Sequence, residues 1–181
     1  AVVSPDASLW PLVCLGELHK AGALAGAEQL VPVLALHRFS EGAPGSGPSD
    51  WHTSTGFLDT LIGMLKRYGF TSVPVAALGA YMTSEDSKLL PARPVAITID
   101  DGSASIASLF EPRAAAAGLS YAVALVTGWV DDDKPQVIDM GGGLTDEILT
   151  WRQTKALART GRVEIISHSH LQHRYAKTGR D

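Results

Sequence analysis

The sequence has little of what several common classes of protein require. Its 181 residues include a single cysteine, Cys14, which excludes an internal disulfide and a metal site made only of thiolates. Lysine and arginine total 15 against 19 aspartates and glutamates, so the net charge of −4 gives no basic surface for nucleic acid. No run of about eighteen apolar residues is present, so we expect no transmembrane segment. Apolar residues at 45% and charged residues at 19% are typical of an ordinary globular protein with a sizeable core.

The length suits one domain, or a large part of one. Residues 1–30 are rich in alanine and leucine, and we interpret them as an N-terminal extension with some helix around residues 15–30. The chain starts at Ala1 without a methionine or a charged leader, which is typical of a mature or trimmed form. Residues 31–181 are then expected to form one domain.

Short apolar runs alternate with amphipathic or Ala-rich stretches along residues 31–167. The runs are typical of strands buried on both faces, and they cover residues 31–36, 71–75, 95–99, 121–127 and 163–167. The predicted helices begin near Ser54 or Thr55, near Ser103 and near Thr150. Residues 78–90 are expected to be a helical turn and loop, and residues 128–143 a long loop. This alternation predicts an α/β fold with a largely parallel sheet.

Polar side chains follow three of these predicted strands. His37, the pair Asp100 and Asp101, and His168 each come just after an apolar run. Functional sites of parallel α/β folds are built at the carboxyl ends of the strands, whereas structural residues have no reason to prefer that edge. The sequence therefore predicts that these side chains converge on one site.

Each motif also has a simpler explanation. Aspartates that precede a helix are often N-caps, so Asp100 and Asp101 need not carry any chemistry. The histidines of "SHSHLQHR" could belong to a solvated loop. Helical spacing would pair His170 with His173, strand spacing would pair His168 with His170, and neither pairs His168 with His173. Local geometry alone leaves the choice among them open.

Four stretches resemble the polysaccharide deacetylase family, carbohydrate esterase family 4. "VPVLALHRF" resembles the family's first strand, and "GFLDTLIGMLKRYGFTSVPVAAL" its first helix and second strand. "RPVAITIDDGS" is similar to its Thr-Phe-Asp-Asp-Gly motif, with Ile99 in place of the phenylalanine. "LTWRQTKALARTGRVEIISHSHLQH" is similar to the stretch that leads into its His-Ser/Thr-x-x-His motif. The resemblance runs from about residue 31 to residue 173.

The resemblance implies a role for each of these residues. Asp100 would be the general base, and Asp101, His168 and His173 would hold one divalent ion. Zinc suits these ligands best, although nickel, cobalt or iron would also fit them. In most of the family the last ligand comes four residues after the first histidine, where this chain has Gln172. A histidine one residue later is similar to the deacetylases that act on poly-β-1,6-N-acetylglucosamine of biofilms.

The resemblance also implies a distorted (β/α) barrel, of which this chain would hold the N-terminal part. Five strands do not close a barrel of seven or eight, so we expect a C-terminal continuation or a second chain to complete it. The family's arginine, pocket tryptophan and late histidine acid have no counterpart that the sequence assigns. The family also implies an extracytoplasmic location: periplasmic, associated with the outer membrane, or secreted.

The sequence thus predicts a metal-dependent N-deacetylase of polysaccharides that contain N-acetylglucosamine. His37, Trp51 and Trp129 are the candidate substrate-binding residues. One alternative is a metal-dependent amidase on the same fold, with the glycines at 141–143 shaping its pocket. The other is a glycan-binding module without activity, in which Trp51 and Trp129 stack on sugars, although these tryptophans could equally pack at the rim of the fold.

Overall fold

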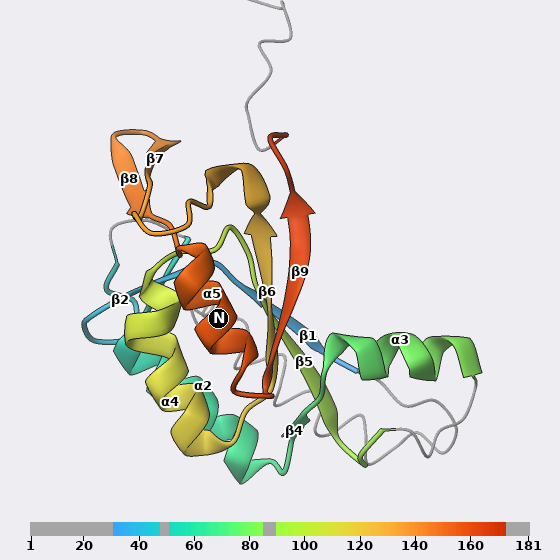
Figure 1. Cartoon of the computed structure of the whole chain (residues 1–181). Coiled ribbons are helices and arrows are strands. Elements are labelled where there is room, and N and C mark those ends of the chain that lie inside the picture. The colour runs from blue at the N-terminus through green and yellow to red at the C-terminus, as the bar shows by residue number, and fades with distance from the viewer. Residues whose placement is uncertain (1–30, 48–50, 85–89, 173–181) are drawn as a thin grey trace, which may run out of the picture.

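A parallel sheet forms the centre of the computed structural model, which describes residues 31–47, 51–84 and 90–172 (Figure 1). The strand order is β1-β5-β6-β9, and the short β4 also pairs with β5. The strands are β1 (Val33–Leu36), β4 (Thr71–Ser72), β5 (Pro94–Ile99), β6 (Tyr121–Val126) and β9 (Val163–Ser169). Every pair in this sheet is parallel, as the alternation of strands and helices predicts. The predicted α/β class is therefore confirmed.

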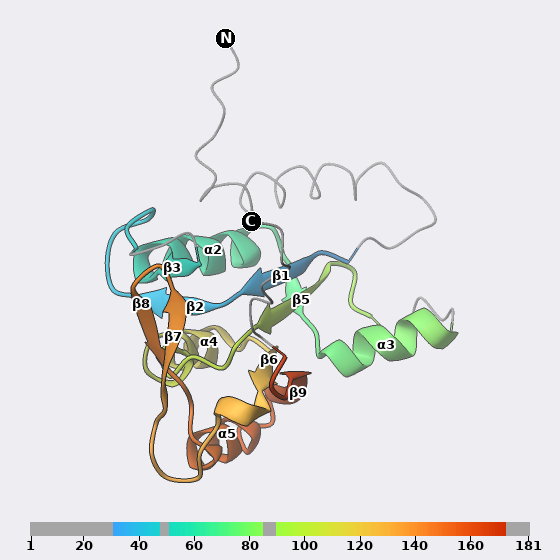
Figure 2. The same ribbon diagram turned by 90° about the horizontal axis from the view of Figure 1, so that it is seen from above.

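Three helical segments cover one face of the sheet and enclose the core (Figure 2). They are α2 (Thr55–Arg67), α5 (Trp151–Ala158), and the π-helix η3 (Ile106–Phe110), which continues into α4 (Glu111–Ala117). Both faces of β6 are buried, which explains why its sequence is an uninterrupted apolar run. The winding changes from π-helical to α-helical just before Pro112.

The predicted helix caps are present. Ser54 is the N-cap of α2 and its side chain accepts a hydrogen bond from the Phe57 N–H. Thr150 and Gln153 form a capping box at the start of α5. Gly69 and Gly161, with φ of +69° and +72°, follow the ends of α2 and α5 in the left-handed conformation that glycine allows.

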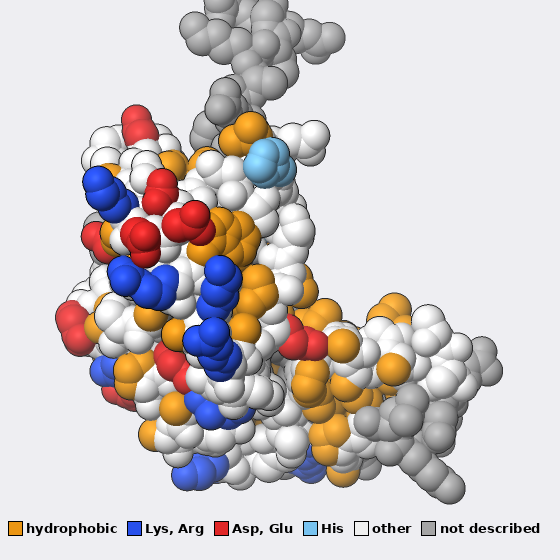
Figure 3. Space-filling model, viewed as in Figure 1, with side chains coloured by type: hydrophobic (Ala, Val, Ile, Leu, Met, Phe, Trp, Pro, Cys, Tyr) orange, Lys and Arg blue, Asp and Glu red, His pale blue; other side chains and the backbone are white. Residues whose placement is uncertain are grey.

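The helix α3 (Val75–Ser84) differs from the prediction, which placed a strand at residues 71–75 and a helical turn only from residue 78. The strand ends after two residues because Pro74 cannot donate to a sheet, and the carbonyl of Pro74 accepts the Leu78 N–H as helix begins. The Glu164 carboxylate accepts the N–H groups of Val75 and Ala76 at the positive end of α3. No residue of α3 is buried, and apolar side chains gather on its surface (Figure 3).

The prediction of a long loop at residues 128–143 is wrong, because part of this stretch folds as an antiparallel hairpin. Its strands are β7 (Val137–Gly141) and β8 (Leu144–Glu147). Gly141, Gly142 and Gly143 all have positive φ and supply the turn. The sequence concealed these strands because neither contains a buried residue or an apolar run. A second pair, β2 (Arg38–Ser40) and β3 (His52–Ser54), was also not predicted.

The sheet is open. Within the described residues, β1 and β9 end the strand order and do not pair with one another, so no closed barrel is seen. The described part also has no helix that is long and apolar enough to span a membrane.

Candidate functional site

The two aspartates lie in a tight turn that follows β5. The Asp100 N–H donates to the Leu36 carbonyl at 2.9 Å, and the Gly102 N–H donates back to the Asp100 carbonyl at 2.9 Å. Asp101 has φ of +69°, a conformation that non-glycine residues rarely adopt. Gly102 has φ of +86°, which favours glycine, and a Cβ atom there would lie 2.6 Å from Cδ2 of the buried Leu125. The turn is therefore fixed by the end of β1 and by packing against β6.

Asp101 is buried against a cation. Its side chain is 3% exposed, and its Oδ2 accepts a hydrogen bond at 3.0 Å from Nη2 of Arg38, which is 5% exposed. The helical segment that follows has Ser105 as its N-cap, without a side-chain capping bond. The simple explanation that the aspartates are helix caps is thus not what the structure shows.

A third charged residue reaches the same guanidinium from the hairpin. Oδ2 of Asp146 lies 3.5 Å from Nε of Arg38, and Oδ1 of Asp146 accepts a hydrogen bond at 3.0 Å from the Ser103 hydroxyl. Burial raises the pKa of Asp146, and the Ser103 hydrogen bond and the charge of Arg38 oppose that rise. Arg38 and Asp146 were missed at the sequence level. The available signal was an arginine two residues after an apolar strand, because a cation buried there would require a partner.

His37 connects the two predicted motifs. It follows β1, is half-buried, and lies edge-on to the ring of Trp51, with centroids 4.7 Å apart. Burial lowers the pKa of His37, the nearby carboxylates of Asp101 and Asp100 oppose that shift, and His168 adds to it. Because β1, β5 and β9 belong to one parallel sheet, His37, the aspartate turn and the end of β9 all lie at its carboxyl edge.

His168 lies within β9, because the strand runs to Ser169, two residues beyond its predicted end at Ser167. Leu125 of β6 pairs with Ser167, while the next residue, Val126, pairs with Ser169. His168 is the extra residue of this β-bulge, a feature that re-aims side chains beside functional sites. The His168 side chain is exposed, and Nδ1 of His170 is 3.0 Å from the Thr127 hydroxyl. His173 lies outside the described residues.

A divalent ion is compatible with the donor atoms on this edge. A carboxylate has two oxygens, so the ion pair of Asp101 through Oδ2 is compatible with a metal bond through Oδ1. An exposed imidazole on a bulge and a carboxylate are ligand types that zinc accepts. Over residues 31–47, 51–84 and 90–172, no group of three or more histidine, cysteine, aspartate or glutamate side chains forms a metal site. The complete predicted set includes His173 and so remains a prediction.

The predicted tryptophans lie near different parts of this edge. Trp51 immediately precedes β3, is 60% exposed, and contacts His37. Trp129 ends the short 3-10 helix η4 (Thr127–Trp129) after β6 and is partly buried. The structure brings Trp51 into contact with a predicted site residue, His37.

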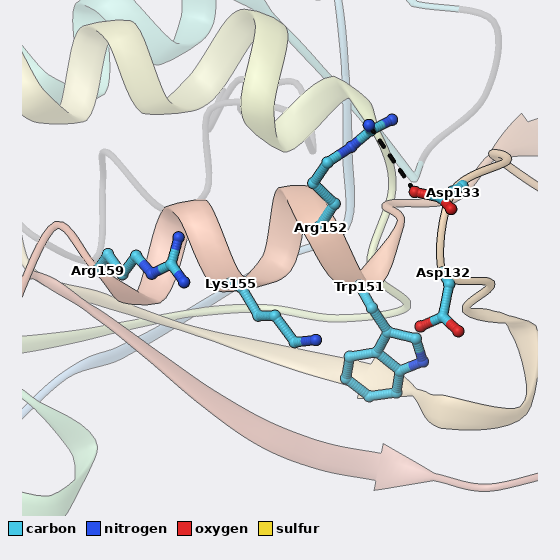
Figure 4. A pocket seen from close by; sticks show the side chains of 6 residues that line it. All are labelled: Asp132, Asp133, Trp151, Arg152, Lys155 and Arg159. Atoms are coloured by element: carbon cyan, nitrogen blue, oxygen red, sulfur yellow. Dashed lines mark ion pairs between the residues drawn. The ribbon is translucent and has the colours of Figure 1, made fainter.

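A separate hollow of about 250 Å³ lies on the flank of the molecule along α5 (Figure 4). Charged side chains of both signs meet there, and Arg152 pairs with Asp133 at 3.8 Å (Figure 4). Its lining residues are Asp132, Asp133, Trp151, Arg152, Lys155 and Arg159. None of the predicted site residues is among them, so this hollow is distinct from the candidate site.

Known proteins show similarity to this chain in both sequence and fold. A poly-β-1,6-N-acetyl-D-glucosamine N-deacetylase of Escherichia coli strain K12 is 30% identical over 111 residues, covering 60% of this chain and 16% of that protein. The BpsB deacetylase domain from Bordetella bronchiseptica is 26% identical with a TM-score of 0.58, covering 82% of this chain and 59% of that one. A de-N-acetylase from Aggregatibacter actinomycetemcomitans has a TM-score of 0.66 at 24% identity, covering 80% and 56% respectively.

No family model matches the sequence. The chain spans about one sixth of the length of the curated relative, and less than two thirds of the solved chains. Its similarity nevertheless includes both the sequence and the parallel α/β fold, as the motifs predict. This chain is therefore related to the polysaccharide deacetylases.

Proposed function

We propose that the chain carries the catalytic edge of a metal-dependent polysaccharide N-deacetylase. The observation that supports this most is the position of His37, Asp100, Asp101 and His168 at the same carboxyl edge of the parallel sheet. The substrate we propose is poly-β-1,6-N-acetylglucosamine of a biofilm exopolysaccharide, since the 30% identical relative is named for that polymer.

Each residue has a role in this proposal. Asp101 and His168, with His173, would hold one divalent ion, most suitably zinc. When bound, such an ion would polarise the acetamide carbonyl and lower the pKa of water. Asp100 accepts the proton of the water as it attacks the carbonyl carbon. The nitrogen takes up a proton as the C–N bond breaks, and acetate and a glucosamine amine result. His37 and Trp51 would contact the sugar beside the acetamide.

The proposal extends to the architecture and location. We propose that residues 31–181 form a deacetylase domain after an N-terminal extension, and that a C-terminal continuation or a second chain closes the barrel. Among the described residues β1 and β9 each have a strand on one side only, which supports this, because unpaired strand edges are usually covered. An exopolysaccharide substrate favours an extracytoplasmic location: periplasmic, outer membrane-associated or secreted.

Acetate release from a poly-β-1,6-N-acetylglucosamine oligomer tests the proposed activity directly. The expected result is acetate formation that stops when a chelator removes the ion and returns when zinc is added. Measurement should include the chain as given and the chain with its proposed completing segment. Hydrolysis of small cyclic amides without acetate release would favour the amidase alternative. Oligomer binding with neither reaction would favour a glycan-binding module.

The tryptophans are expected to matter more for long substrates than for short ones. Trp51→Ala and Trp129→Ala should reduce kcat/KM for long oligomers, with little effect on the monosaccharide or disaccharide, because an indole ring stacks on sugar units beyond the reacting one. Steady-state kinetics across a length series measures this. Met82→Ala is the control, since Met82 is 73% exposed on α3, outside the candidate site. An equal loss of kcat/KM at every oligomer length would mean that Trp51 and Trp129 do not line the substrate groove.

A further inference from the structure

Three charged side chains from distant parts of the sequence meet inside the protein next to the candidate site. Arg38 begins β2, Asp101 belongs to the turn after β5, and Asp146 lies on β8. The side-chain exposures of Arg38, Asp101 and Asp146 are 5%, 3% and 13%. Burying charge is costly unless the charges are paired, and here one guanidinium serves two carboxylates. The cluster therefore has a net charge of −1 when all three groups are ionised.

The guanidinium uses different atoms for each carboxylate. Nη2 contacts Asp101 at 3.0 Å, and Nε faces Asp146 at 3.5 Å. Only arginine presents donors in a rigid planar fork, whereas lysine offers one compact ammonium group. A lysine at position 38 would keep the charge but could not hold both carboxylates in this arrangement.

The other oxygen of the Asp146 carboxylate, Oδ1, is held by Ser103. The Ser103 hydroxyl donates to Asp146 at 3.0 Å and lies 2.7 Å from the Ser105 hydroxyl. The Ser105 hydroxyl accepts the N–H of Phe39, the residue after Arg38, at 2.9 Å. This ring of contacts returns to β2, so the hairpin and the aspartate turn are tied to the same strand.

Asp101 needs such support because of its backbone. Its φ of +69° is unfavourable for a residue with a Cβ, and such conformations persist only where the surroundings fix them. A residue held in this way presents its carboxylate in one orientation. The contact with Arg38 engages Oδ2, which determines where Oδ1 points.

We propose that Arg38 is a positioning residue for Asp101, and that Asp146 orients Arg38 and shares its charge. Because Asp146 also pairs with the guanidinium, it neutralises part of the positive charge of Arg38. Asp101 then keeps enough negative charge to bind a cation. The hairpin β7–β8 thereby becomes part of the support of the site. This inference rests on the proposed function only in taking Asp101 as a ligand of the divalent ion.

Zinc affinity of the 181-residue chain, measured by competition with a chelating dye, tests this inference. Arg38→Lys and Asp146→Asn should each weaken zinc binding by about 10- to 100-fold, the usual effect of losing a partner of a metal ligand. The double variant should be weakened by less than the product of the two single effects, because both changes disrupt one network. The melting temperature of the metal-free protein, measured in parallel, shows how much of each variant is folded.

Arg113→Lys is the matched control. Arg113 also pairs with an aspartate, Asp59, at 2.9 Å, but that partner's side chain is 60% exposed. Zinc affinity and melting temperature should both remain unchanged in this variant.

Three outcomes would overturn the inference. One is a lowered melting temperature of the metal-free Arg38→Lys and Asp146→Asn proteins with unchanged zinc affinity of the folded fraction, which would mean a purely structural role. Another is a double variant whose fold-loss of zinc affinity equals the product of the two single losses. The third is a wild-type chain that binds no zinc. If the wild-type chain binds zinc but releases no acetate even with its completing segment, the proposed function is overturned and this inference stands.

Discussion

Asp100→Asn is expected to lower the rate of acetate release by on the order of 10²–10⁴ while zinc stays bound, because it removes the general base and spares the ligands. Asparagine is nearly the same size, and the backbone contacts of Asp100, its N–H to Leu36 and its carbonyl to Gly102, do not involve the side chain. The fold of the turn should therefore survive the change. Acetate release and zinc content of the same preparation measure the two effects.

Asp101→Asn is the matched variant, one residue further along, and should have the reverse signature. It replaces an anionic ligand with a neutral amide, so zinc binding should weaken. It also removes the anion that pairs with the buried guanidinium of Arg38, so the melting temperature should fall. If Asp100→Asn loses zinc and Asp101→Asn keeps it, the two roles are reversed. If both variants keep zinc, the deacetylase interpretation of this turn is wrong.

The sequence was most informative where burial and local chemistry agree. The apolar runs of β5 and β6 predict buried parallel strands, and the capping residues Ser54 and Thr150 predict where helices begin. Each of these signals is local, so it can be recognised in the sequence without knowledge of the tertiary contacts. The hairpin β7–β8 carries no such signal, because its side chains are exposed or only partly buried, and only its three glycines mark a turn.

The candidate site was predictable in part for the same reason. Asp100, Asp101 and His37 follow apolar strands, which is a pattern in the sequence, and the structure places all three at one edge of the sheet. The position of His168 on a bulge depends on the register between β6 and β9, which no local pattern specifies. The joining of Arg38 with Asp146, 108 positions apart, likewise arises only when the hairpin folds back over the aspartate turn.

The aromatic centre of the core gives the largest expected change in stability. Phe110 is 1% exposed at the end of the π-helix, stacks on Phe39 with centroids 5.0 Å apart, and lies edge-on to Tyr121 at 4.8 Å. Phe39 follows Arg38 on β2, so this ring also supports the strand that carries the buried guanidinium.

Phe110→Ala should therefore lower the free energy of unfolding by about 3–5 kcal/mol, the sum of lost burial and an unfilled cavity. Since a domain of this kind is usually stable by about 5–15 kcal/mol, denaturant titration should show a much lower midpoint or a largely unfolded protein. Phe110→Leu keeps an apolar side chain in place and should lose less, which gives a measurable variant if the alanine protein does not fold. Met82→Ala, on the exposed face of α3, should change the free energy by no more than about 0.5 kcal/mol. A loss below about 1 kcal/mol for Phe110→Ala would mean that these rings do not form the centre of the core.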